Sequence, residues 1–207
     1  MLDLFLRGKN QDKEAFVMSG ISFEKLESVN TKEKYAFVKE LLALGKENPK
    51  DLYPYLPQII HMLDTGNNII IWAGIELLGS LITIDKSHRI KLQLPRLYTY
   101  LNTGKMITAN HAVAALSEIA KVEVELQDQI VEEILEIQEY EYDTEECKNI
   151  VYGNIIKGMV TCYPTLQNEK TKKKVVEFIR KQKENTRNAT KKKAEEFLKR
   201  YAKQENI

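Results

Sequence analysis

The stretch YLPQIIHMLDTG, residues 55–66, returns as QLPRLYTYLNTG at residues 93–104. Leu-Pro, Leu and Thr-Gly recur at a constant offset of 38 residues: Leu56 and Pro57 match Leu94 and Pro95, Leu63 matches Leu101, and Thr65 and Gly66 match Thr103 and Gly104. Self-similarity at a period of about 20–50 residues is typical of proteins built from stacked repeats. The repeat therefore predicts an array of similar units.

Each copy is followed by a second apolar segment, NNIIIWAGIELLGSLITID after Gly66 and KMITANHAVAALSEIAKVE after Gly104. Apolar or small residues recur there with the spacing i, i+3, i+4, i+7, which is one face of an α-helix. These residues are Gly74, Leu77, Leu78 and Leu81 in the first copy, and Ala112, Ala115, Leu116 and Ile119 in the second. Each unit is predicted to be a helix, a short turn with glycine, and a second helix.

The same apolar face recurs twice more, after offsets of 40 and 42 residues. We therefore predict an all-α fold, in which about four antiparallel helix pairs over residues 50–202 stack into an α-α superhelix. Residues 1–49 are expected to form N-terminal capping helices, and the whole chain, 1–207, a single domain. One helix pair cannot bury its own apolar face, so each unit needs its neighbour. The two weaker matches are Tyr152, Ile155, Ile156 and Met159, and Ala194, Phe197, Leu198 and Tyr201.

The pattern resembles HEAT repeats over about residues 50–202. Pro57 and Pro95 lie inside a first helix, where that family often has a kinking proline, and Gly74-x-x-x-Leu78-Gly79 resembles its second helix. The family's ladder of Asp and Arg is missing, because Thr65 and Ile71 stand at those positions in the first clear unit. HEAT-like is therefore the better description, and an armadillo arrangement stays open. The resemblance implies a right-handed solenoid that acts as a scaffold and holds other macromolecules on the concave face of its second helices.

The face of each second helix opposite to its apolar residues would line that concave surface. We predict that Trp72, Asn110, Asn154, Lys157 and Lys199 contact a protein partner there. Trp72 is the only tryptophan, and two interpretations of it remain open. It is either an exposed anchor in a binding groove or a ring packed between neighbouring helices.

Charge is distributed unevenly along the chain. Residues 118–146 contain twelve acidic residues and one lysine, a net charge of −11, and residues 168–207 contain fourteen Lys or Arg and six Glu, a net charge of +8. The basic end could bind the phosphates of a nucleic acid, and Arg187, Lys191, Lys192 and Lys193 are the candidate residues for this alternative. It could equally be the solvated outer face of a terminal unit, or meet the acidic stretch of another copy in self-association.

No motif indicates catalysis or a cofactor. The three histidines are far apart, Cys147 and Cys162 have no metal-ligand or CxxC spacing, and no nucleotide-binding glycine motif occurs. Some HEAT-like proteins of similar size are alkylpurine DNA glycosylases with a basic groove, several tryptophans and a catalytic Asp. This chain has one Trp and no Asp on the deduced inner face, so we expect no enzyme activity, no metal and no cofactor.

The most apolar stretch, residues 69–84, is shorter than the roughly 18–20 residues that span a bilayer and contains Glu76. The N-terminus MLDLFLRGKN does not have the form of a secretory signal. We therefore expect a soluble, cytoplasmic protein with free thiols, which serves as a non-catalytic scaffold or adaptor for a protein partner.

Overall fold

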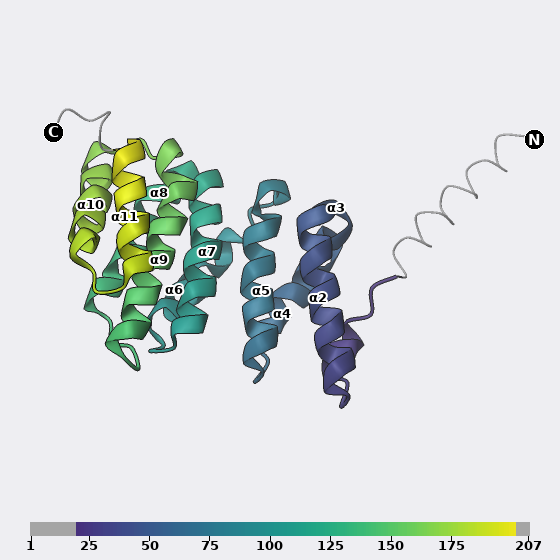
Figure 1. The fold of residues 1–207 in the computed structure, drawn as a ribbon. Helices are drawn as coiled ribbons and strands as arrows, with labels where there is room; N and C mark the ends of the chain where they lie inside the picture. The colour runs from purple at the N-terminus through teal and green to yellow at the C-terminus, as the bar shows by residue number, and fades with distance from the viewer. Residues whose placement is uncertain (1–19, 202–207) are drawn as a thin grey trace, which may run out of the picture. The chain divides into compact units, whose positions relative to one another are not determined.

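The computed structural model describes residues 20–201, and all regular structure in that range is helical (Figure 1). No strand occurs among these residues, so the prediction of an all-α fold is confirmed. The α-helices are α2 Thr31–Glu47, α3 Pro49–Leu52, α4 Leu56–Met62, α5 Asn68–Leu81, α6 Leu94–Thr99, α7 Met106–Val122, α8 Gln127–Leu135, α9 Glu145–Cys162, α10 Glu169–Lys181 and α11 Asn188–Tyr201.

Short 3-10 helices join or extend these helices. They are η1 Phe23–Glu27, η2 Tyr53–Tyr55, η3 Ile82–Ile84, η4 Lys91–Gln93, η5 Tyr100–Asn102, η6 Val124–Leu126, η7 Glu136–Glu139, η8 Tyr163–Thr165 and η9 Gln182–Glu184. Pro57 and Pro95 are the second residues of α4 and α6, and a 3-10 turn precedes each helix. A proline is tolerated there because the first turn of a helix needs no N–H donor. Both prolines thus lie within continuous helical segments, 49–62 and 91–102.

The chain divides into two compact units, Met1–Glu40 and Leu41–Ile207, and the boundary falls inside α2. The single domain over residues 1–207 stays a prediction, and residues 1–19 of the expected capping region lie outside the described residues. In the first unit, Phe23 of η1 packs edge-on against Phe37 of α2, with 5.9 Å between the ring centroids. Asn30 begins α2, because its Oδ1 accepts hydrogen bonds from the backbone N–H groups of Lys32 and Glu33.

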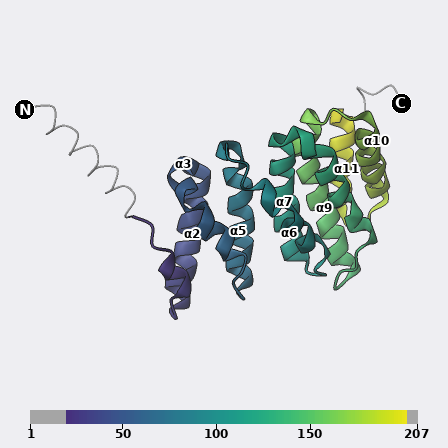
Figure 2. The ribbon, with the colours of Figure 1, turned by 180° about the vertical axis from the view of Figure 1, so that it is seen from behind.

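In the second unit, the four long helices α5, α7, α9 and α11 pack one on the next in sequence order (Figures 1 and 2). The shorter helices pack beside them: α4 on α5, α6 and α8 on α7, and α10 on α8 and α11. Three of these contacts, α4 with α5, α6 with α7 and α10 with α11, join the two helices of a predicted unit, whereas α8 packs mainly on α7 and α10. A curved superhelix and its handedness stay predictions.

The core of this unit consists of the repeated apolar positions. The eight positions from Gly74 to Ile119 that the two clearest copies share are all buried. In α11, by contrast, Ala194 and Phe197 are buried but Leu198 and Tyr201 are half-exposed. Within the described residues no further helix packs on α11, so the apolar face of this last helix is covered less completely.

The turns explain why the quoted stretch contains Thr-Gly. The hydroxyl groups of Thr65 and Thr103 donate hydrogen bonds to the carbonyls three residues earlier, at 3.0 and 3.5 Å, and so close the first helices. Gly104 has φ +71°, a left-handed conformation that favours glycine. Asn67 then begins α5 by accepting from the N–H groups of Ile69 and Ile70.

Across residues 20–201 no helix combines the length and the apolar character that a membrane crossing requires.

Candidate binding surface on the second helices

Residues of α5, α7 and α9, with Lys46 from the end of α2, line one hollow of about 340 Å³. Small residues form much of its wall, and polar or charged residues form the remainder. The small residues are Gly79, Ala114, Ala115, Ser117 and Gly158. The others are Lys46, Glu76, Ser80, Asn110, Glu118, Asn154, Lys157 and Thr161. This surface, which we call the central hollow, lies on the helix face that the sequence assigns to a partner.

Close helix contacts explain the small residues. A Cβ atom on Gly79 would lie 2.9 Å from Cα of Ala115, and one on Gly158 would overlap Oγ of Ser117. Ser117 is itself buried, and its hydroxyl donates to the Val113 carbonyl at 2.7 Å. At Gly79 the helices α5 and α7 therefore approach backbone to backbone, and Gly158 leaves room for the Ser117 side chain, so the central hollow lies above a close-packed floor.

The wall of the central hollow carries opposite charges at its two ends. On α5, Glu76 accepts from Lys46 at 2.9 Å, and its other oxygen lies 3.8 Å from Nδ1 of His111. On α9, Lys157 is exposed and forms no ion pair with any residue in the range 20–201. An incoming ligand thus meets a neutralised carboxylate at one end and an unpaired ammonium group at the other.

Two of the predicted contact residues, Asn110 and Asn154, lie in the wall of the central hollow. The amide of Asn154 donates to the Ile150 carbonyl in its own helix at 3.2 Å. The Oδ1 atom of Asn110 is buried and accepts no hydrogen bond. A buried carbonyl without a donor is costly, so a small rotation of this side chain towards a donor from a partner would be favourable.

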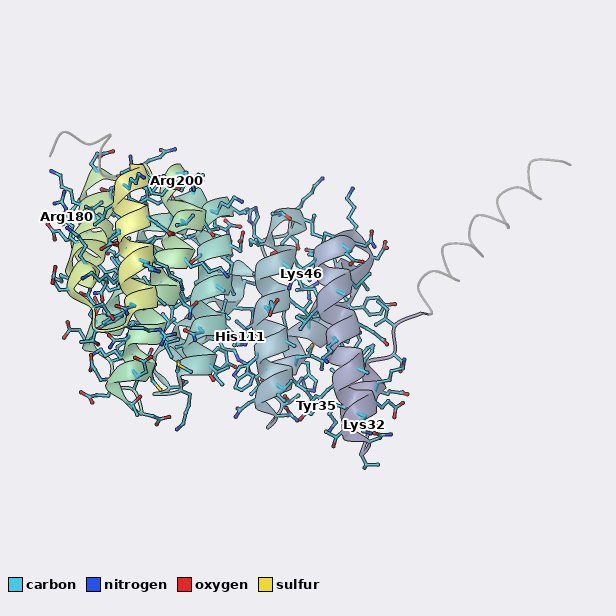
Figure 3. All side chains as sticks on the ribbon, viewed as in Figure 1. Lys32, Tyr35, Lys46, His111, Arg180 and Arg200 are labelled. Carbon is cyan, nitrogen blue, oxygen red and sulfur yellow. The ribbon has the colours of Figure 1, made fainter. Side chains whose placement is uncertain are left out.

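Trp72 connects α5 to α7. Its Nε1 donates to Oγ1 of Thr108 at 2.9 Å, and its ring stacks on His111 with 5.7 Å between centroids and an interplanar angle of 11°. Figure 3 shows His111 between the two helices. The ring is half-buried, which agrees with the interpretation that it packs between neighbouring helices.

Burial lowers the pKa of His111, and the nearby Glu76 carboxylate opposes this shift. The imidazole is therefore neutral at physiological pH, as suits a ring that stacks on an indole. Beside this stack, Ile69 and Ile107 occupy equivalent positions in the first turns of α5 and α7, and they are 38% and 44% exposed. The second-helix face thus adds exposed aliphatic surface near Trp72.

The remaining predicted partner contact, Lys199, lies on α11 and is exposed. It does not line the central hollow. The structure therefore brings Asn110, Asn154 and Lys157 together, places Trp72 on the same face, and leaves Lys199 apart. Sequence reasoning missed Lys46, because the end of α2 belongs to no repeat. It also missed Glu118, because this residue comes one position after a residue of the deduced face.

Some of the candidate nucleic-acid-binding residues contact other residues of the protein. Arg187 forms an ion pair with Glu146, and Nζ of Lys193 donates to the Gly153 carbonyl at 3.1 Å. Lys192 is exposed and Lys191 is half-exposed. Two of the four cations thus have partners in α9, but only Arg187 is paired with a carboxylate.

The acidic and basic stretches of the sequence meet inside the molecule. Lys174 of α10 lies 2.5 Å from Glu132 of α8, and Asn168 donates to Asp128 at 2.8 Å. These pairs join residues about 40 positions apart, so the two stretches belong to successive units that stack. Stacking thus offsets part of the uneven charge.

Between residues 20 and 201 no group of three or more His, Cys, Asp or Glu side chains could hold a metal ion. Both cysteines are free, and burial raises the pKa of the Cys162 thiol to about 12, so this sulfur is not a nucleophile at neutral pH. The Tyr142 hydroxyl donates to the Leu101 carbonyl at 2.7 Å, so this tyrosine joins the segment before α9 to η5.

The sequence matches no protein-family model, and a search of curated proteins gives no match.

Proposed function

We propose that this protein is a non-catalytic scaffold or adaptor with a HEAT-like solenoid fold, which binds a protein partner across the second helices α5, α7 and α9. The observation that carries the proposal is the central hollow, because three successive helices contribute to one polar depression. Polar side chains from two of these helices, Asn110, Asn154 and Lys157, line it together.

The chemistry of the central hollow suits a peptide or protein surface. Its wall offers hydrogen-bonding groups and one unpaired cation, and its small residues leave room for a side chain. The exposed Ile69 and Ile107, with the half-buried Trp72, provide apolar surface on the same helices. An apolar patch with a polar rim is the usual anatomy of a protein interface.

The free thiols of Cys147 and Cys162 support a reducing compartment, and we infer that the protein is cytoplasmic.

The test is to fill the central hollow without disturbing the floor. Ala114 is exposed in the wall, so Ala114→Arg places a long side chain there with little effect on packing. Ala189, exposed in the first turn of α11 and outside the central hollow, gives the matched control Ala189→Arg. Proteins captured from extracts of the native host are compared by quantitative mass spectrometry. Loss of specific partners with Ala114→Arg alone supports the proposal, and equal recovery with both variants contradicts it.

Nucleic-acid binding by the basic end is the alternative proposal. The exposed cations of α10 and α11, such as Lys173 and Lys192, favour it, whereas the ion pair of Arg187 with Glu146 counts against it. A gel-shift experiment at low salt with single- and double-stranded oligonucleotides decides the matter. A shift that weakens steeply with salt and is lost when Lys191, Lys192 and Lys193 are neutralised would replace the first proposal.

A further inference from the structure

A second hollow, of about 250 Å³, lies between α9 and α11. Ile156, Val160 and Phe197 provide its apolar part. Ile156 and Phe197 are buried, whereas Val160 is 37% exposed and is the apolar side chain that a ligand could cover. Lys157 lines both this hollow and the central one, so the two adjoin at this residue.

The charged groups around this α9–α11 hollow are mostly positive. Lys157, Lys193 and Arg200 line it, against a single carboxylate, Glu196. Of the described acidic groups, none forms an ion pair with any of the three cations. Arg200, near the C-terminal end of α11 in Figure 3, lies over the ring of Tyr201, and Lys157 is exposed.

The cations are close enough to affect one another. Burial lowers the pKa of Lys193, and the positive charges of Lys157 and Arg187 lower it further. The Gly153 carbonyl accepts one hydrogen bond from Lys193 but carries no full charge. An anionic group placed among these cations would relieve their repulsion, so the hollow is complementary to negative charge.

We propose that the α9–α11 hollow binds an acidic segment of a protein partner, with an apolar side chain over Val160 and flanking carboxylates at Lys157 and Arg200. This inference rests on the proposed function and names the chemistry of the partner. A peptide fits the site better than a nucleic acid, because it combines an apolar side chain with a few spaced charges. A phosphate chain carries a charge at every nucleotide and has no aliphatic side chain to cover Val160.

The test uses the full chain and a fluorescein-labelled peptide, in which two central leucines are flanked on each side by three glutamates. Fluorescence anisotropy at low and at physiological salt measures its affinity. In one control peptide glutamine replaces every glutamate, and in another serine replaces both leucines. Labelled oligothymidylate of twenty nucleotides serves as the nucleic-acid probe.

Charge reversal of both free cations, Lys157→Glu with Arg200→Glu, should weaken the acidic peptide at least about tenfold. The matched control is Lys121→Glu with Lys173→Glu, two exposed lysines that line neither hollow, and it should change affinity less than about twofold. Val160→Ser should weaken the peptide with leucines but not the one with serines.

The inference is overturned if the acidic peptide does not bind, if both charge-reversal pairs weaken it equally, or if oligothymidylate binds more tightly than the peptide. Its failure is separable from that of the proposed function. Ala114 lines the central hollow and not the α9–α11 hollow, so partner capture by Ala114→Arg tests the proposed function without reference to the peptide. If capture depends on Ala114 and the acidic peptide nevertheless fails to bind, only the partner chemistry assigned here is wrong.

Discussion

Gly79 of α5 lies directly against Ala115 of α7, so closely that a Cβ atom on the glycine would be 2.9 Å from Cα of the alanine. The neighbouring atom belongs to the backbone, which cannot move aside as the end of a long side chain can. This contact determines how closely α5 approaches α7. It lies at the floor of the central hollow.

Gly79→Ala should therefore destabilise the protein by about 1–3 kcal/mol, because the added methyl group forces α5 and α7 apart. Urea unfolding followed by circular dichroism measures the change in the free energy of unfolding. Gly66→Ala is the control, since a Cβ atom there meets nothing within 4 Å. Equal stability of the two variants would show that the close approach of α5 and α7 does not constrain the fold.

Asp85 should make the stability of the protein depend on pH in the acidic range. It is buried, and its carboxylate accepts hydrogen bonds from the Tyr53 hydroxyl and the Ile90 N–H, both at 2.6 Å. Burial raises the pKa of Asp85, but these hydrogen bonds outweigh burial, so the pKa is lowered. Stability from this group is present above the unfolded-state pKa of about 3.9 and is lost as pH falls through the lower folded-state value.

Asp85→Asn should cost about 1–3 kcal/mol at neutral pH, since an amide satisfies these donors less well. As the pH falls below about 4, the free energy of unfolding should also decrease less for the variant than for the wild type. Denaturant unfolding across this range is the measurement. If the free energy of unfolding falls equally with pH in the two proteins, the Asp85 carboxylate does not contribute to acid sensitivity.

The stack of Trp72 on His111 provides a spectroscopic probe, because Trp72 is the only tryptophan in the chain. Burial lowers the pKa of His111, so the fluorescence of Trp72 should change with a midpoint below the ordinary value of about 6.5 as the imidazole becomes protonated. Glu76, with Lys46 beside it, faces the ring from the α5 side and moderates the shift.

His111→Gln should abolish this fluorescence transition, whereas His61→Gln, at an exposed histidine of α4, should leave it intact. The folded state disfavours the charged imidazole, so unfolding binds a proton and stability falls as pH drops below about 6.5. A transition that persists in His111→Gln would assign it to another group.

Trp72→Phe separates the hydrogen bond of the indole from its packing. Loss of the bond to Thr108 leaves a buried hydroxyl without its donor and should cost about 1 kcal/mol. Trp72→Ala also removes the ring and should cost about 3–5 kcal/mol. Thermal or urea unfolding of both variants tests this, and partner capture by Trp72→Phe then reports on binding without a large loss of stability.

The repeat in the sequence was enough to predict an all-α fold and the approximate positions of its helix pairs. Leu78, Leu116 and Ile156 occupy matching positions in three successive copies, and all three are buried. The prediction succeeded because the spacing of apolar residues reports directly which face of a helix is buried. The second-helix face was deduced in the same way, since it lies opposite to the buried one.

Only the tertiary structure decided how these helices meet. Three contacts join residues from different helix pairs. Trp72 stacks on His111, Gly79 lies against Ala115, and Glu132 pairs with Lys174. The distance and rotation between neighbouring helices determine such contacts, and these depend on packing of the whole array. Sequence periodicity describes one helix at a time, so it placed Asn110 and Lys157 on equivalent helix faces but could not show that they share one hollow.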